Sequence, residues 1–100
     1  MKNTASKLVT IVTEAVLETM LVSDIDALGA LGYTITDARG KGRRGKRDAG
    51  WAPHANIRIE VICDAATAQV LCQALSDRYG DNYPMLMTIA EITVLMPDAS

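Results

Sequence analysis

Apolar and polar positions alternate most regularly over Asn56–Cys63, where one side of the segment is entirely apolar. This period of two is typical of a β-strand with one buried face. Lys7–Thr13 and Met85–Met96 are β-branched and aliphatic runs with apolar residues on both sides, which predicts strands with two covered faces. Tyr33–Ala38 has the same β-branched and aromatic character and predicts a fourth strand.

Two other segments repeat apolar residues every three or four positions, which is the period of an amphipathic helix. The first follows Thr13, an expected N-cap, and is expected to stop at Gly29 or Gly32. The second follows Asp64, which can cap it, and extends to Tyr79. The apolar stripes predicted for the two helices are Val16, Leu17, Met20, Leu21, Ile25 and Leu28 in the first, and Ala66, Val70, Leu71, Ala74 and Leu75 in the second.

In chain order the elements are strand, helix, strand, long loop, strand, helix and strand. This βαββαβ order predicts an α+β, ferredoxin-like sandwich, in which a four-stranded antiparallel sheet carries both helices on one face. The long loop, Gly40–Pro53, joins the second and third strands, and a turn-rich link, Gly80–Pro84, precedes the last strand. Because the first and last strands are apolar on both sides, we expect self-association to cover the second sheet face.

Length and composition suit one domain, residues 1–100, in which 49% of the residues are hydrophobic. No apolar run reaches the roughly 18 to 20 residues that a membrane span needs, and no signal-peptide pattern is present. We therefore expect a cytoplasmic protein without membrane insertion. Cys63 and Cys72 are too few for a disulfide framework or a metal site of the CxxC type, so two buried free thiols are expected.

The segment Arg39–Arg47 gathers six of the chain's ten Lys and Arg residues, interleaved with glycines and without an acidic residue. It carries a charge of +6, which leaves the rest of the chain at −8 for a net charge of −2. Such an excess points to an anionic partner for one loop, because glycine N–H groups and basic side chains both donate to anions. Three interpretations stay open: a phosphate-bearing ligand, a nucleic acid, or a solvated basic loop.

No catalytic or metal-binding constellation stands out. His54, the single histidine, has no other ligand at metal-binding spacing, and the glycine-rich segment lacks the Ser or Thr that closes a P-loop. A weak nucleotide hydrolase using Asp37 or Asp48 would also need a metal ion, and the chain is not expected to be an enzyme. The predicted strands Lys7–Thr13 and Asn56–Cys63 contain no aromatic residue for base stacking, which disfavours nucleic-acid binding.

Three short motifs together resemble the PII signalling family: GYT at residues 32–34, GKG at residues 40–42 followed by two spaced arginines, and ANI at residues 55–57. The similarity is greatest to the carbon-sensing PII-like branch, the SbtB-type and carboxysome-associated proteins, and extends over nearly the whole chain. It implies a homotrimer whose intersubunit clefts bind adenine nucleotides. It also implies a T-loop, here about residues 40–55, that changes conformation to engage a partner protein.

The resemblance further implies individual ligand contacts. Gly32 and Thr34 match positions that meet the adenine base, and Asn56 matches the residue that closes the T-loop. Tyr83 matches a tyrosine of the turn before the last strand. The complete set of implied nucleotide-binding residues is Gly32, Thr34, Gly40, Lys41, Gly42, Arg44, Arg47, Asn56 and Tyr83.

The chain also departs from classical PII proteins. Tyr83 stands where they have a phosphate-binding lysine, and Val94 and Met96 stand where they have two arginines. These differences favour AMP, ADP or cyclic AMP over ATP with 2-oxoglutarate, the nitrogen-sensing combination, and ATP alone is a further candidate ligand. Arg43 replaces the usual serine of the carbon-sensing branch and makes the loop more basic, a role that the sequence does not explain.

Surplus positive charge would allow a second anion to bind beside the nucleotide phosphates. In carbon-sensing members that anion is bicarbonate, and Lys41, Arg44 and Arg47 are the candidates to bind it here. The resemblance thus predicts a regulator without catalytic cofactor that controls inorganic-carbon uptake or fixation through a bicarbonate transporter or a carboxysome component. The alternative is a ferredoxin-like module that binds nucleic acid through the same basic loop.

Overall fold

The structure is a computed structural model that describes residues 2–30, 32–40 and 56–96 of the chain. Its elements follow the order β-strand, helical segment, two strands, helix and strand that the sequence pattern predicts. They are β1 (Lys2–Glu14), the 3-10 helix η1 (Ala15–Leu17), α1 (Glu18–Ala27), β2 (Gly32–Asp37), β3 (Asn56–Cys63), α2 (Ala65–Tyr79) and β4 (Met85–Met96).

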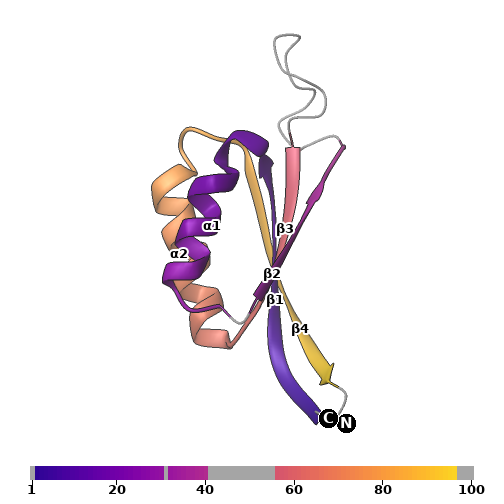
Figure 1. Cartoon of the computed structure of the whole chain (residues 1–100). Helices are drawn as coiled ribbons and strands as arrows, with labels where there is room; N and C mark the ends of the chain where they lie inside the picture. The colour runs from indigo at the N-terminus through magenta and orange to yellow at the C-terminus, as the bar shows by residue number, and fades with distance from the viewer. Residues whose placement is uncertain (1, 31, 41–55, 97–100) are drawn as a thin grey trace.

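The four strands form one antiparallel sheet in the order β2-β3-β1-β4, and both helices lie on the same face of it (Figure 1). This arrangement confirms the predicted ferredoxin-like α+β fold. Strand β1 is central and pairs along its length with β4, from Lys2 opposite Met96 to Thr13 opposite Met85. It begins five residues earlier than the predicted strand at Lys7, because its first residues have β4 as a partner.

The core lies between the helices and the odd-numbered positions of the central strands, since successive side chains of a strand point to opposite faces. Its members are almost completely buried. They are Val9, Ile11, Leu17, Leu21, Ile25, Ile57, Ile59, Val61, Cys63, Ala68, Leu71 and Leu75.

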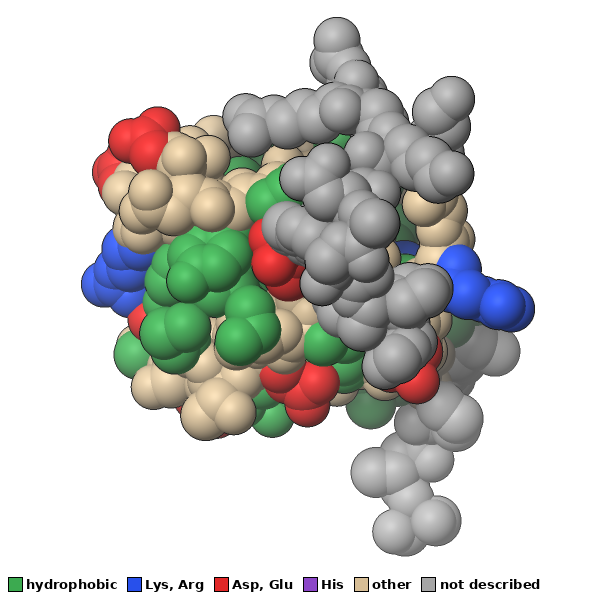
Figure 2. All heavy atoms as spheres, turned by 90° about the horizontal axis from the view of Figure 1, so that it is seen from above, with side chains coloured by type: hydrophobic (Ala, Val, Ile, Leu, Met, Phe, Trp, Pro, Cys, Tyr) green, Lys and Arg blue, Asp and Glu red, His purple; other side chains and the backbone are tan. Residues whose placement is uncertain are grey.

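The apolar stripes of the helices are narrower than predicted. Leu21 and Ile25 of α1 are buried, as expected, but Met20 is 44% exposed, Val16 in η1 is 69% exposed and Val70 in α2 is 53% exposed. A helix lying on a sheet buries only the side chains that face the sheet, so neighbours at the edge of the stripe stay in solvent. Figure 2 shows a group of apolar side chains on the helical side of the molecule. Other exposed apolar residues lie on β4, namely Leu86, Ile89, Leu95 and Met96.

The prediction of Thr13 as an N-cap is wrong, whereas the predicted end of the first helix at Gly29 and the predicted start and end of the second helix are confirmed. Thr13 lies within β1 and is fully buried, and the residue before η1 is Glu14. Gly29 ends the α1 segment with φ of +76°, a conformation that glycine adopts without steric cost. Asp64 caps α2 as predicted, because its Oδ1 accepts a hydrogen bond from the Thr67 N–H at 2.7 Å.

The second face of the sheet carries no helix in the part of the chain that the structure describes (Figure 1). Even-numbered positions line this open face, where Leu8 pairs with Ile62 and with Ala90 in the register, and Val12 pairs with Leu86. Leu86 is 55% exposed. The predicted apolar character of this face is thus present in the fold.

The two cysteines differ in burial. Cys63 at the end of β3 is buried, with 2% exposure, and Cys72 in α2 is only partly buried. Both are free thiols, as expected, although the expected full burial holds for Cys63 alone. Burial raises the pKa of both thiols, and the nearby Asp64 charge adds to the increase at Cys63.

Candidate functional site

The nucleotide-binding residues implied by the sequence fall into two groups. Gly32, Thr34, Gly40, Asn56 and Tyr83 lie within the described part of the chain. The others lie outside the described residues and are Lys41, Gly42, Arg44 and Arg47, which include all three bicarbonate candidates.

Gly32 and Thr34 lie on the edge strand β2, on the open face of the sheet. In the register they stand opposite Ile62 and Glu60 of β3, and both are exposed. A Cβ added at Gly32 or at Gly40 would meet no described atom within 4 Å. Packing among the described residues therefore does not require glycine at either position, and both leave backbone accessible to a ligand or to another subunit.

Asn56 begins β3 at the end of the sheet where the β2–β3 connection enters. Its carbonyl oxygen accepts a hydrogen bond from the Ala38 N–H at 3.0 Å, which holds the two ends of that connection together. Asn56 is 8% exposed, and its side-chain Oδ1 has no hydrogen-bond partner among the described residues. A buried amide oxygen without a donor is costly, so a donor from outside the described residues would stabilise this position.

Tyr83 lies in the turn between α2 and β4, and several hydrogen bonds fix this turn. The N–H groups of Asn82 and Tyr83 both donate to the Tyr79 carbonyl oxygen, at 3.1 and 3.0 Å. The hydroxyl of Thr13 donates to the Pro84 carbonyl oxygen at 2.8 Å. The rings of Tyr79 and Tyr83 meet edge to face, with their centroids 6.5 Å apart.

Tyr79 is in turn anchored to α1. Its hydroxyl donates to Asp24 Oδ2 at 2.7 Å, and Arg78 Nη1 donates to the other carboxylate oxygen of Asp24. The hydrogen bond to Asp24 raises the pKa of the Tyr79 hydroxyl, because an ionised oxygen could no longer donate to the carboxylate. Asp24, with 14% of its side chain exposed, thus links both helices.

The fold brings some of the predicted residues together and separates others. Asn56 and the residues that flank the β2–β3 connection lie at the same end of the molecule as the turn Gly80–Pro84 (Figure 1). Gly32 lies at the other end of β2, six residues from the connection, and Tyr83 packs against the helix-side core. The described residues of one chain therefore do not form a single enclosed pocket around all five positions.

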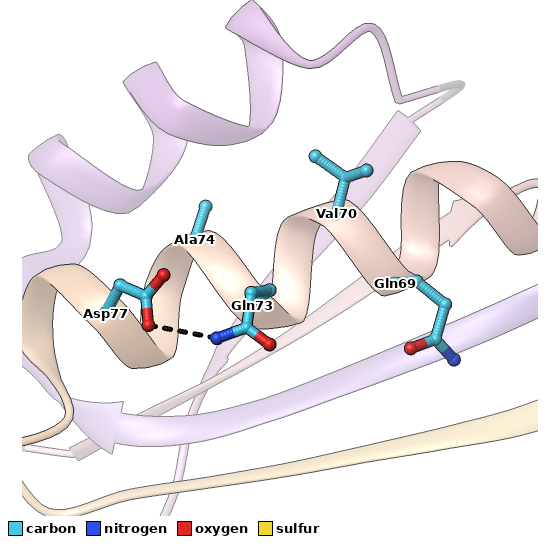
Figure 3. A pocket seen from close by; sticks show the side chains of 5 residues that line it. All are labelled: Gln69, Val70, Gln73, Ala74 and Asp77. Atoms are coloured by element: carbon cyan, nitrogen blue, oxygen red, sulfur yellow. Dashed lines mark hydrogen bonds between the residues drawn. The ribbon is translucent and has the colours of Figure 1, made fainter.

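A hollow of about 470 Å³ lies elsewhere, on the outer side of α2. It is lined by Gln69, Val70, Gln73, Ala74 and Asp77, and none of the predicted site residues takes part (Figure 3). Gln73 Nε2 donates to Asp77 Oδ1 at 2.9 Å across one helical turn, so these polar groups already satisfy each other. The hollow is shallow and offers no converging polar groups for a small ligand.

Among residues 2–30, 32–40 and 56–96, no three His, Cys, Asp or Glu side chains lie close enough together to hold a metal ion. None of the helices in this same part of the chain has the length and apolar content needed to cross a bilayer.

Sequence reasoning missed the residues that support the turn. Asp24 occupies a position whose polar neighbours suggest only a solvated helix face, and Tyr79 was expected merely to end α2. Their contact joins residues that are 55 positions apart in the chain, which no local pattern signals. Thr13 carried a signal, a hydroxyl at an apolar β position, but that signal was assigned to a helix cap.

The sheet order and the single layer of helices define a ferredoxin-like α+β protein of the PII type. Residues 6–99 match the family described as Nitrogen regulatory protein P-II, and the chain belongs to this family. A protein of Thermus thermophilus that is described as PII-like and signalling has 41% sequence identity to it. Its solved structure superposes with a TM-score of 0.80, over 95% of this chain and 94% of that one.

More distant solved structures share the fold. CPII, a nitrogen regulatory PII-like protein of Thiomonas intermedia K12 in a structure bound to ADP, AMP and bicarbonate, is 22% identical. It matches with a TM-score of 0.79 over 96% of this chain and 99% of that chain. A DUF3240 family protein of Shewanella baltica OS155 is 20% identical and matches with a TM-score of 0.71, over 95% and 97% of the two chains.

Proposed function

We propose that this protein is a non-enzymatic, cytoplasmic PII-like regulator of the carbon-sensing branch. It binds an adenine nucleotide, ADP or AMP in preference to ATP, and takes bicarbonate as a second ligand. Residues 1–100 act as one PII-like domain whose T-loop, about residues 40–55, reports the bound state to a partner such as a bicarbonate transporter or a carboxysome component.

One observation supports the proposal most. The basic, glycine-rich segment joins β2 to β3, and the Ala38 N–H bonded to the Asn56 carbonyl holds its two ends side by side. The segment with six cationic residues therefore starts and finishes at one end of the sheet, the end that also carries the turn with Tyr83. Phosphate neutralises such a concentration of like charge and would favour one conformation of the loop.

The open face of the sheet supports a homotrimer as the functional unit. Its apolar positions on β1, β3 and β4 are covered by no helix of the described chain, and three copies of this face arranged around a threefold axis would remove them from water. Gly32 and Thr34 are exposed on the edge strand of this face. A cleft between subunits could therefore unite positions that a single chain keeps apart.

CPII supports the choice of ligands, because its structure contains ADP, AMP and bicarbonate in the same fold. Tyr83 in place of a phosphate-binding lysine is consistent with a ligand that has fewer phosphates than ATP. We assign nucleotide contacts to Gly32, Thr34, Gly40, Lys41, Gly42, Arg44, Arg47, Asn56 and Tyr83, and bicarbonate contacts to Lys41, Arg44 and Arg47.

Calorimetric titration with AMP, ADP, ATP and cyclic AMP, each with and without bicarbonate, tests the proposal. We expect AMP or ADP to bind with at least micromolar affinity and the R44Q/R47Q variant to bind at least roughly tenfold more weakly, since each arginine donates charge-assisted hydrogen bonds. The control is K7Q, which removes one positive charge at the Lys7–Glu91 pair in the middle of the β1–β4 ladder, on the sheet face opposite Gly32 and Thr34. Absence of binding by all four nucleotides up to millimolar concentration would contradict the proposal.

The same basic segment could bind a nucleic acid, and competition distinguishes the two functions. If a labelled RNA or DNA oligomer binds with a steep salt dependence, is not displaced by ADP or AMP, and neither nucleotide binds alone, the loop is a nucleic-acid site. Displacement by nucleotide at constant ionic strength supports the sensor.

A further inference from the structure

The turn Gly80–Pro84 is built with little freedom. The Gly80 N–H donates to the Ser76 carbonyl oxygen at 2.9 Å, and a Cβ at Gly80 would lie 2.6 Å from that oxygen. Only glycine fits there without a backbone shift. The chain then folds back so that two successive N–H groups of the turn reach the Tyr79 carbonyl oxygen. The Tyr79 carbonyl oxygen therefore accepts both hydrogen bonds that close the turn.

The side chain of Tyr79 contacts the turn a second time. Its ring meets that of Tyr83 at an interplanar angle of 70°, an edge-to-face contact, while its hydroxyl donates to Asp24 on the neighbouring helix. One end of the side chain thus contacts the turn and the other end is fixed to α1. Any rotation of Tyr79 that broke the Asp24 hydrogen bond would also move the surface against which Tyr83 packs.

The negative charge of Asp24 is not stabilised by the dipole of its own helix. It is in the last turn of α1, near the negative end of the helix dipole, and that turn contains no basic residue. Its carboxylate instead receives one hydrogen bond on each oxygen from α2, from Arg78 and from Tyr79. Charge-assisted hydrogen bonds to a largely buried carboxylate are strong and directional, which suits a group that fixes the geometry of another element.

We propose that Asp24 and Tyr79 are positioning residues for Tyr83, and that they hold the Gly80–Pro84 turn in the geometry that contacts the nucleotide. This inference rests on the proposed function for its consequence, because Tyr83 is the only residue of the turn assigned to the ligand. Neither Asp24 nor Tyr79 needs to touch the nucleotide. They act through the hydroxyl-to-carboxylate hydrogen bond and the contact between the two rings.

The test is a double-mutant cycle on AMP and ADP affinity, measured by calorimetry on the full chain. Y79F removes only the hydroxyl and should weaken binding roughly threefold to tenfold, as expected when a hydrogen bond to a charged group is lost. In a Y83A background the same change should alter affinity by less than about twofold, because no ring remains to be positioned. D24N, which keeps an acceptor oxygen but loses the charge, should give an intermediate loss.

The matched control is E91Q, which weakens the ion pair between Lys7 and Glu91 in the middle of the β1–β4 ladder, away from the turn, and should leave nucleotide affinity unchanged. Circular dichroism and sedimentation would show that each variant keeps its fold and assembly. An equal loss of affinity from Y79F in both backgrounds, or no loss in either, overturns the positioning role.

Amide hydrogen exchange without nucleotide separates this inference from the proposed function. In Y79F the Asn82 and Tyr83 amides should exchange at least roughly threefold faster, while those of Ile59 and Val61 in β3 stay unchanged. Unchanged exchange at Asn82 and Tyr83 overturns the positioning role whatever binds. If exchange rises as expected but wild-type protein binds no nucleotide, the proposed function fails while the support of the turn by Tyr79 stands.

Discussion

Thr13 and Pro84 are joined by a hydrogen bond of 2.8 Å in which the buried threonine hydroxyl donates to the proline carbonyl oxygen. The bond ties the end of the central strand β1 to the turn that precedes β4. It also explains why a polar side chain occupies a fully buried position, since the hydroxyl satisfies a carbonyl that the sheet register leaves unpaired.

Replacing Thr13 with valine keeps the shape of the side chain but removes this donor. We expect T13V to lower the free energy of unfolding by about 1 to 3 kcal/mol, because the Pro84 carbonyl oxygen would be left partly buried without a partner. Urea unfolding followed by circular dichroism measures the change. T13S retains the hydroxyl and should lower the free energy of unfolding less than T13V does. T10V removes a hydroxyl on the open face and should change the free energy of unfolding little. Equal stability of T13V and wild type would show that the bond contributes nothing.

A charge on the open sheet face should dissociate the proposed trimer. Leu8 lies in the middle of that face, between Ile62 and Ala90 in the register. L8R would bury a guanidinium at an interface between copies but leave it in solvent in a monomer, so we expect monomers. Sedimentation equilibrium measures the oligomeric state of each variant. The control V70R places the same charge on the exposed side of α2 and should stay trimeric; the opposite pattern would assign the interface to the helices.

The cap of α2 gives a prediction that depends on pH. The hydrogen bond from the Thr67 N–H lowers the pKa of the Asp64 carboxyl below its ordinary 3.8, so the ionised form is favoured in the folded state. The stabilisation is therefore present at neutral pH and is lost as the pH falls through the lowered value. D64A should melt at a lower temperature than wild type at pH 7, and the difference should shrink near pH 2. D64S, which can still cap, should melt between the two at pH 7.

Thiol reactivity should follow burial of the two cysteines. Cys63 is 2% exposed and Cys72 is partly exposed, and burial raises both thiol pKa values, so little thiolate is present at pH 7.5. In native C72S the remaining Cys63 should react with a disulfide reagent roughly a hundredfold more slowly than in denaturant. In native C63S the remaining Cys72 should react faster than Cys63 does. Rapid modification of native Cys63 would show that the end of β3 opens readily.

Much of the fold could be predicted because it is encoded locally. β3 and β4 begin and end where the alternation and apolar runs begin and end, and Asp64 caps α2 because a carboxylate before an apolar helical period has few other roles. The error at Thr13 has the opposite cause. A threonine before a helical period looks like a cap, but its partner, the Pro84 carbonyl, lies 71 residues away and outweighs the local preference.

The candidate site was predictable only in part. The glycines and cations of the basic segment are visible in sequence because their composition is unusual, and the family motifs supplied the rest. The support of Tyr83 by Tyr79 and Asp24 depends on the packing of α1 against α2. No periodic pattern of residues in the sequence indicates this contact. Bringing Gly32 to the Tyr83 turn would require a second subunit, which the pattern of one chain cannot specify.

The position of β1 in the sheet constrains the order in which the protein can assemble during synthesis. Its neighbours in the sheet are β3 and β4. β1 therefore has no strand to pair with until β3, Asn56–Cys63, has been translated, and its second partner, β4, is complete only at Met96. Only β2 and β3 pair as consecutive strands, and the long basic connection separates them. With so few local strand pairings, we expect folding to be slow for a domain of this size, and to complete the sheet only once β4 has joined it.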